Sequence, residues 1–212
     1  MSETAIVHIV EDDESLRASL DSLFRSVGLA TRLYGSARAF MEADRPDAPG
    51  CLVLDIRLPG MSGLDFQAQL QESGVRLPVI LMTGFGDIPM SVRGMKAGAV
   101  DFLTKPFRDQ DMLDAVATAI ERDTARRAAE GDAADLHGLF GTLSPRERQV
   151  MALVTAGKMN KQVAGDLNLS EITVKIHRGH AMRKMGARSL ADLVRMAEAL
   201  QLRPDGTVER PA

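Results

Sequence analysis

The sequence predicts an α/β domain, built on a doubly wound, five-stranded parallel sheet, followed by a small all-α domain. Over the first ~120 residues, short apolar runs alternate with amphipathic segments, which is typical of a parallel sheet covered by helices. From Leu143 onward the apolar residues recur only with helical spacing. The chain has 212 residues, which is enough for two domains of ordinary size.

Five apolar runs are the strand candidates, because each is too short to form a helix of its own. They are Ala5–Val10, Ala30–Tyr34, Cys51–Asp55, Pro78–Thr83 and Ala99–Leu103. Asp13 and Ser15 are candidate caps of the first helix, and Asp87 is the candidate start of the helix before the fifth strand. A last helix is expected to begin near Asp109 and to run past Glu121.

Charged and polar residues stand at the carboxyl ends of these strands. Glu11 and Asp12 follow the first strand, and Asp55 ends the third. Thr83 ends the fourth strand, and Lys105 follows the fifth. In open parallel sheets the ligand site lies at this edge, and the strand order 2-1-3-4-5 places the first and third strands about 4.8 Å apart. The sequence therefore predicts one acidic cluster at the edge of the sheet.

This cluster contains the groups that phosphoryl transfer requires. Several carboxylates in close contact repel one another unless a cation intervenes, and oxygen ligands without His or Cys suit Mg²⁺. Asp55 is the candidate nucleophile, with Lys105 and Thr83 as ligands of the phosphoryl oxygens. The alternative for any single carboxylate is that it only caps a helix. Fitting groups at several strand ends favour the phosphoryl site.

Residues 1–122 resemble the response-regulator receiver domain, on the motifs IVEDDES, LVLDIRLPGMSG, LMTGFGD and GAVDFLTKPF. The resemblance implies a flavodoxin-like sheet and phosphorylation of Asp55 by a sensor histidine kinase. It also implies an acidic pocket of Glu11 and Asp12, with Mg²⁺ bound by Asp12, Asp55 and the backbone carbonyl of Arg57.

The same resemblance implies that Thr83 and Phe102 form a switch pair, in which Thr83 moves toward the phosphoryl group and the Phe102 ring turns inward. Lys105 would precede a cis Pro106. Arg57 and Phe85 occupy positions beside the phosphoryl group that vary within the family. A phosphotransferase of the haloacid-dehalogenase type is disfavoured, because it needs a second Asp where Arg57 stands.

Charge separates the two halves of the chain. The net charge of −3 is the sum of an acidic front and a basic rear. Residues 1–142 hold 14 Lys/Arg against 22 Asp/Glu, a balance of −8, whereas residues 143–203 hold 11 against 5, a balance of +6. Nucleic acid is the commonest partner of a compact basic module, and a solvated basic face is the alternative.

The segment between the two domains, residues 123–142, is polar and rich in alanine. We expect it to extend the last helix of the first domain and then to form a flexible joint at 138–142. A coiled-coil contact between two chains is the less favoured alternative, because few apolar heptad positions are present. Residues 204–212 are expected to form a flexible tail.

Residues 143–203 predict a helix-turn-helix. Ser144 and Pro145 open a helix that stops at Gly157, a second short helix follows, and Ser170 caps a third. The second member of such a pair enters the DNA major groove. Helical spacing places Val174, Ala181 and Met185 toward the core, and Leu190, Leu193, Val194 and Ala197 on the apolar stripe of the last helix.

Candidate DNA contacts follow from this facing. Lys175, Gly179 and Arg183 share the outer face, with Ile176 at its edge. Lys175 can read guanine and Ile176 can touch a thymine methyl. The full candidate set is Lys158, Asn160, Lys161, Thr173, Lys175, Ile176, Arg178, Gly179, Arg183 and Lys184, several of them as phosphate contacts. A zinc site at His177 and His180 is disfavoured, because no third ligand stands near them.

This half resembles the LuxR-type helix-turn-helix, on LSPRERQVMALVTAG, NKQVAGDLNLSEITVKIHR and MRKMGARSLADLV. Together with the front domain it resembles the FixJ/NarL family of two-component response regulators. The resemblance implies a transcription regulator that is not an enzyme and that dimerises on phosphorylation to bind a two-fold DNA site. In relatives the position of Gly179 can carry a base-contacting side chain, which this chain lacks.

Two rival functions belong to other classes. The first is a DNA-binding protein with an inert receiver, which the intact acidic and basic set disfavours. The second is a Mg²⁺-dependent phosphatase, which the short loops and the lack of a second nucleophile disfavour. The chain has a single cysteine, no signal peptide and no apolar run of ~20 residues, so we expect a cytoplasmic protein without membrane contact.

Overall fold

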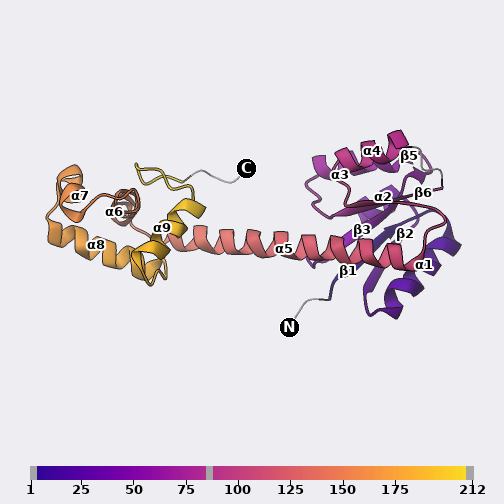
Figure 1. Cartoon of the computed structure of the whole chain (residues 1–212), viewed down its shortest axis with the longest axis horizontal. Coiled ribbons are helices and arrows are strands. Elements are labelled where there is room, and N and C mark those ends of the chain that lie inside the picture. The colour runs from indigo at the N-terminus through magenta and orange to yellow at the C-terminus, as the bar shows by residue number, and fades with distance from the viewer. Residues whose placement is uncertain (1–3, 85–87, 209–212) are drawn as a thin grey trace. The chain divides into compact units, whose positions relative to one another are not determined.

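The computed structural model describes residues 4–84 and 88–208. The chain forms two compact units, residues 1–127 and 128–212, and each has its own apolar core (Figure 1). No helix in the described part of the chain is long and apolar enough to span a membrane.

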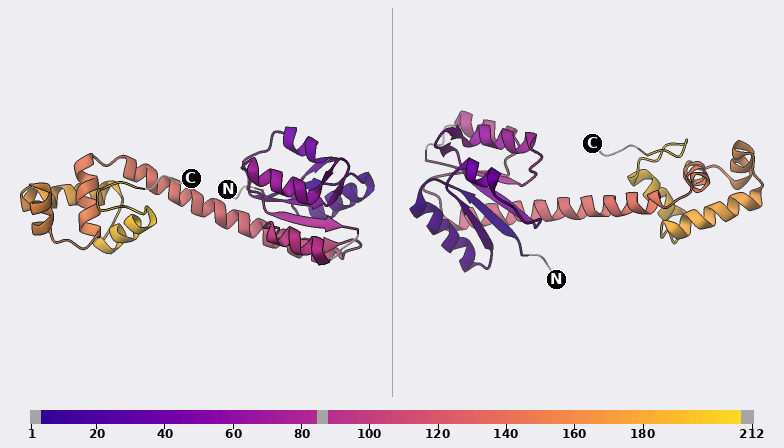
Figure 2. Two further views of the ribbon diagram at one scale, coloured as in Figure 1. Left: turned by 90° about the horizontal axis from the view of Figure 1, so that it is seen from above. Right: turned by 180° about the vertical axis from the view of Figure 1, so that it is seen from behind.

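The first unit is built on a five-stranded parallel sheet (Figure 2). Its strands are β1 Ile6–Val10, β2 Ala30–Tyr34, β3 Gly50–Asp55, β6 Val79–Thr83 and β7 Asp101–Thr104. The spatial order β2-β1-β3-β6-β7 confirms the predicted order. A small antiparallel pair, β4 Arg57–Leu58 and β5 Met61–Ser62, was not predicted, because two-residue strands leave no periodic pattern.

Helices cover both faces of this sheet. They are α1 Glu14–Ser26, α2 Ala37–Glu42, α3 Gly63–Glu72, α4 Ile88–Lys96 and α5 Asp109–Gly141. In β3, Cys51 and Val53 pack against α1 and α5, whereas Leu52 and Leu54 pack against the layer of α2, α3 and α4. Alternate residues of a strand point to opposite faces, so a strand covered on both sides must be apolar throughout.

Helix caps decide between the two candidates at the start of α1. The Asp13 carboxylate accepts hydrogen bonds from the backbone N–H groups of Ser15, at 2.8 Å, and Leu16, at 3.1 Å. The interpretation of Asp13 as a cap is confirmed, and the alternative cap Ser15 is wrong because it lies in the first turn. Ser36 caps α2. Asp87, the expected start of α4, lies outside the described residues.

The expected joint at 138–142 is wrong for most of its length, because α5 continues to Gly141. Phe140 is buried in the core of the second unit together with Leu143 and Met151. Packing of this aromatic side chain stabilises the last turn, and it outweighs the low helix propensity of the glycines around it.

The second unit contains four further helices after α5: α6 Pro145–Thr155, α7 Asn160–Leu167, α8 Glu171–Lys184 and α9 Leu190–Ala199. Ser144, Ser170 and Ser189 cap α6, α8 and α9. Val174, Ala181 and Met185 are fully buried, as their spacing predicted. The predicted apolar stripe of α9 is wrong at Leu190, which is 45% exposed, because the core beneath this helix begins one turn later.

His8 of β1 lies in an aromatic cluster within the first unit. Its side chain is 3% exposed, its ring stacks on Tyr34 at 5.9 Å, and its Nδ1 lies 3.2 Å from the Tyr34 hydroxyl. Burial, assisted by the positive charges of Arg32 and Arg45, lowers the pKa of His8 to about 4. The folded unit therefore holds this imidazole neutral where the unfolded chain protonates it.

We predict that the first unit loses stability as the pH falls from 6.5 toward 4, because the unfolded chain binds a proton at His8 that the folded unit excludes. From pH ~7 to ~5 the free energy of unfolding should fall by about 1–2 kcal/mol through this group alone. Tyr34 is the only tyrosine and the chain has no tryptophan, so urea unfolding followed by tyrosine fluorescence reports this unit.

The control is His8→Phe, which keeps an aromatic ring but cannot titrate. Its free energy of unfolding should depend less on pH by the same about 1–2 kcal/mol. Equal pH dependence in the two proteins would show that His8 titrates alike in the folded and unfolded states.

Candidate functional site

Three carboxylates meet at the carboxyl edge of the sheet. Glu11 and Asp12 follow β1, Asp55 ends β3, and these two strands are paired with Val10 opposite Leu54. Each carboxylate offers an oxygen, and the three oxygens lie within 4.8 Å of one another. Glu11 and Asp55 are buried and Asp12 is exposed. The strand order thus brings together the acidic residues that the sequence placed at separate strand ends.

Lys105 lies between the two buried carboxylates. Its Nζ is 2.6 Å from Glu11 Oε2 and 2.8 Å from Asp55 Oδ2. Its backbone N–H donates to the Thr83 carbonyl at 2.7 Å, and the peptide bond to Pro106 is cis, as the resemblance implied. One ammonium group therefore offsets part of the charge of two carboxylates.

The carboxylates and the ammonium group influence one another's protonation. Burial, and then the negative charge of Asp55, raises the pKa of Glu11, against the effect of its hydrogen bond with Lys105. Burial alone would lower the pKa of Lys105, but its hydrogen bonds to Asp55 and Glu11 outweigh burial and raise it. Both shifts favour the protonated form, so this edge of the sheet stabilises positive charge, as a bound cation would supply.

The donor set of this cluster fits a hard cation. All its ligand atoms are carboxylate oxygens, which Mg²⁺ and Ca²⁺ prefer, and no softer donor from His or Cys is included. Among the described residues, this trio is the one group of such side chains with metal-ligand spacing. His177 and His180 form no comparable group there, and His180 Nδ1 instead lies 3.5 Å from Glu147 Oε1.

Two residues that the sequence analysis did not select hold the loops of this site. Arg17 donates from Nη1 to the backbone carbonyls of Glu11, at 2.7 Å, and Asp12, at 3.3 Å. A Cβ on Gly63 would lie 2.5 Å from the Asp55 carbonyl oxygen, so this close approach requires glycine. The sequence does not reveal this role of Arg17, because the side chain of a basic residue near the start of a helix is ordinarily expected to point into solvent.

The expected switch residues lie on the neighbouring strands β6 and β7. Thr83 is fully buried at the end of β6. Phe102 in β7 is partly buried and packs against the core layer of α2, α3 and α4. Arg57 is exposed, and its backbone N–H donates to Asp55 Oδ1 at 3.1 Å. Phe85 lies outside the described residues.

The second unit presents α7 and α8 as a helix-turn-helix, with Asn168 in the left-handed conformation at the turn, at φ 53°. On α8, Lys175 and Gly179 are exposed and Ile176 is 51% exposed. A Cβ added at Gly179 would meet no atom of the described chain within 4 Å, so packing inside this unit does not require glycine there.

Several candidate DNA contacts already have partners within the unit. Lys158 pairs with Asp166 at 2.7 Å, and Arg178 donates to Asn160 Oδ1 at 3.3 Å. The Thr173 hydroxyl lies 2.8 Å from Ser170 Oγ. In the described part of the chain, the charged candidates without an ion pair are Lys161, Lys175, Arg178 and Arg183, and of these Arg178 has the hydrogen bond to Asn160.

Lys184 lies in an internal network. Its Nζ is 2.7 Å from Glu147 Oε2 and 3.1 Å from the Thr142 carbonyl oxygen. The Lys184 hydrogen bond holds the pKa of Glu147 at about 2, well below its ordinary value, and the Glu147 side chain also completes the capping box with Ser144. The structure therefore gives Lys184 a structural role that its position in the sequence did not reveal.

Comparisons with known proteins agree with this arrangement. Residues 7–117 match the family described as response regulator receiver domain, and residues 141–197 match bacterial regulatory proteins of the luxR family. The chain is 60% identical to nodulation protein W of Bradyrhizobium diazoefficiens, over 97% of this chain and 91% of that protein. It is 46% identical to the transcriptional regulatory protein FixJ of Rhizobium meliloti, over 91% and 95% of the two chains.

A solved structure resembles the chain over both units. The response regulator StyR superposes with a TM-score of 0.84 at 46% identity and covers 92% of this chain and 98% of its own.

Proposed function

The chain belongs to the response regulators that join a receiver domain to a LuxR-type DNA-binding domain, and from this premise we propose that Asp55 accepts a phosphoryl group from a sensor histidine kinase. Membership makes the protein a two-component transcription regulator. The observation that supports Asp55 as the acceptor is its carboxylate, buried beside Glu11 and 2.8 Å from Lys105.

The chemistry at Asp55 is a displacement at phosphorus. A carboxylate oxygen of Asp55 forms the new P–O bond while the phosphorus–nitrogen bond of the donor phosphohistidine breaks, and the electron pair leaves with the imidazole. Glu11, Asp12, Asp55 and the backbone carbonyl of Arg57 are the proposed Mg²⁺-binding groups. Mg²⁺, when bound, supplies positive charge beside the phosphoryl oxygens.

Lys105 has a second part in this reaction. Its ammonium group holds Glu11 and Asp55 before transfer. Transfer places negative phosphoryl oxygens beside Asp55, and Lys105 can then donate to one of them. Because a single flexible side chain serves both arrangements, its position depends on whether Asp55 is phosphorylated.

The proposed output is dimerisation followed by DNA binding. Thr83 would donate its hydroxyl to the phosphoryl group, and Phe102 would fill the space that Thr83 leaves. These movements change the surface of α4 and β7, where Val92 and Met95 are 45% and 46% exposed. Pairing of two receivers through this surface would bring two DNA-binding units to a two-fold site.

DNA is the proposed partner of the second unit, and this implies a cytoplasmic location. The exposed face of α8 carries the candidate base contacts Lys175 and Ile176, and Lys161 on α7 is a candidate phosphate contact. Thr173 and Arg183 complete the same face. Lys158, Asn160, Arg178 and Lys184 would reach DNA only by exchanging the partners described above.

We predict that small phosphodonors label Asp55 once per chain. Incubation with acetyl phosphate and Mg²⁺ should add the mass of one phosphoryl group to the peptide containing Asp55, because this buried carboxylate lies beside Lys105 and the cation ligands. Asp55→Asn should take up none, and Asp65→Asn, an exposed position on α3, should behave as wild type. Labelling that persists in Asp55→Asn would place the acceptor elsewhere.

The same reaction separates the switch from a phosphatase. A switch releases acetate until the site is filled and then slows to the hydrolysis rate of the acyl phosphate. Rapid release of many phosphates per chain from unrelated phosphate esters would instead favour the phosphatase.

We predict that Lys161 and Lys184 serve different purposes. Lys161→Ala should reduce the steepness of the fall of log K with log salt for a mixed-sequence duplex by about 0.9, because it removes one phosphate contact. The stability of the second unit should not change.

Lys184→Ala should reduce the amide hydrogen-exchange protection of α6 and α8 by about 1 kcal/mol, because Glu147 loses its partner. Unchanged protection in Lys184→Ala would contradict the structural role of Lys184.

A further inference from the structure

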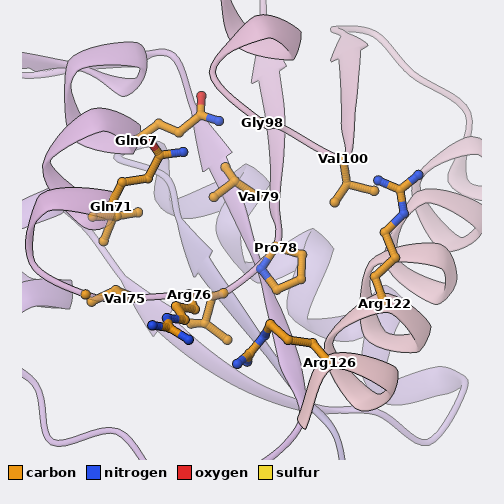
Figure 3. A pocket seen from close by; sticks show the side chains of 13 residues that line it. Gln67, Gln71, Val75, Arg76, Pro78, Val79, Gly98, Val100, Arg122 and Arg126 are labelled. Atoms are coloured by element: carbon orange, nitrogen blue, oxygen red, sulfur yellow. The ribbon is translucent and has the colours of Figure 1, made fainter. Parts of the chain in front are cut away.

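A cavity of about 530 Å³ lies in the first unit, at the opposite edge of the sheet from Asp55 (Figure 3). Its walls include Pro78 and Val79, at the beginning of β6, and Val100, directly before β7. Asp55 and Thr83 stand at the carboxyl ends of their strands, so the phosphoryl site and this cavity occupy different edges. The proposed function assigns no role to the cavity.

The cavity is lined by positive charge. Arg76 reaches it from the segment before β6, and Arg122 and Arg126 reach it from successive turns of α5 (Figure 3). None of the 13 lining residues is acidic. Arg126 also pairs with the buried Asp123, whereas the exposed Arg122 has no ion pair with any described residue. Arg122 can therefore bind an anion with its guanidinium group, and the positive charge of Arg76 and Arg126, which also interact with other groups of the chain, adds to the attraction.

The rest of the cavity wall is largely apolar, and it includes one buried amide with an unsatisfied hydrogen-bond acceptor. Leu70, Val79 and Val100 are among its apolar residues. Gln67 is 2% exposed, and its Nε2 donates to the Ala97 carbonyl at 2.9 Å. That bond fixes the orientation of the amide, because the carbonyl needs a donor. Gln67 Oε1 is buried and has no hydrogen-bond partner within the described chain.

We propose that this cavity binds a small organic anion, with its acidic group on the arginines and its apolar body against Val79 and Val100. The volume falls within the range of known small-molecule sites, roughly 300–1,000 Å³. Guanidinium groups bind carboxylates through paired, charge-assisted hydrogen bonds, and they stay charged at any physiological pH. The ligand would contact three parts of the first unit, namely α3, α5 and the segment that follows α4, and would stabilise the unit by binding its folded state.

The test is a titration of the full-length, unphosphorylated protein with benzoate, followed by amide NMR. Benzoate should cause saturable shifts that centre on the amides of Val79, Gly98 and Val100. Benzamide has the same shape without the charge and should cause none that saturate. No saturable shift with benzoate, or equal binding of benzamide, would overturn the proposal and leave a groove of solvated arginines.

Matched variants locate the site. Arg122→Gln should weaken benzoate binding about fivefold or more, because it removes one charge-assisted contact at an exposed position. Arg108→Gln removes an exposed arginine outside the cavity and should bind benzoate as wild type does. Equal loss in both variants would show attraction by overall charge and would overturn the site. Asp55→Asn should bind benzoate unchanged, which separates this result from the fate of the phosphoryl site.

Discussion

The two hydrogen-bonded ion pairs of Lys105 are the interaction on which the first unit depends. Glu11 and Asp55 are 1% and 6% exposed, and burying two carboxylates side by side is unfavourable without a cation. Lys105, which directly follows β7, supplies that cation, with its Nζ 2.6 Å from Glu11 Oε2 and 2.8 Å from Asp55 Oδ2. The three residues are far apart in sequence, so only the completed sheet brings them together, and the charged edge forms only when the fold forms.

This constraint also bears on the proposed switch at Asp55. The cation that stabilises the carboxylates stands on a side chain rather than in the backbone, and burial, followed by the negative charge of Asp55, still raises the pKa of Glu11. A phosphoryl group on Asp55 would add negative charge beside Lys105 and so change its ion pairs. In this account, the change at one edge of the sheet is transmitted through Thr83 and Phe102 to the surface used for assembly.

The sequence predicted the strands, their order and the acidic cluster, because buried parallel strands leave continuous apolar runs and the ligand edge is set by topology. It did not predict Arg17 or the internal role of Lys184, because both are contacts between side chains and distant backbone or carboxylate atoms. The predicted extension of α5 is present, but its last turn, at 138–141, was expected to be a joint. Its glycines argued for a joint, and only the packing of Phe140 shows why the helix persists.

The central claim is that a phosphoryl group on Asp55 controls assembly. The most direct test is the mass of the protein in solution, measured by sedimentation with Mg²⁺ before and after addition of beryllofluoride. Beryllofluoride resembles a phosphoryl group bound to a carboxylate. The account predicts a shift from monomer to dimer in the wild-type protein and none in Asp55→Asn. A constant mass in the wild-type protein, or the same shift in Asp55→Asn, would contradict it.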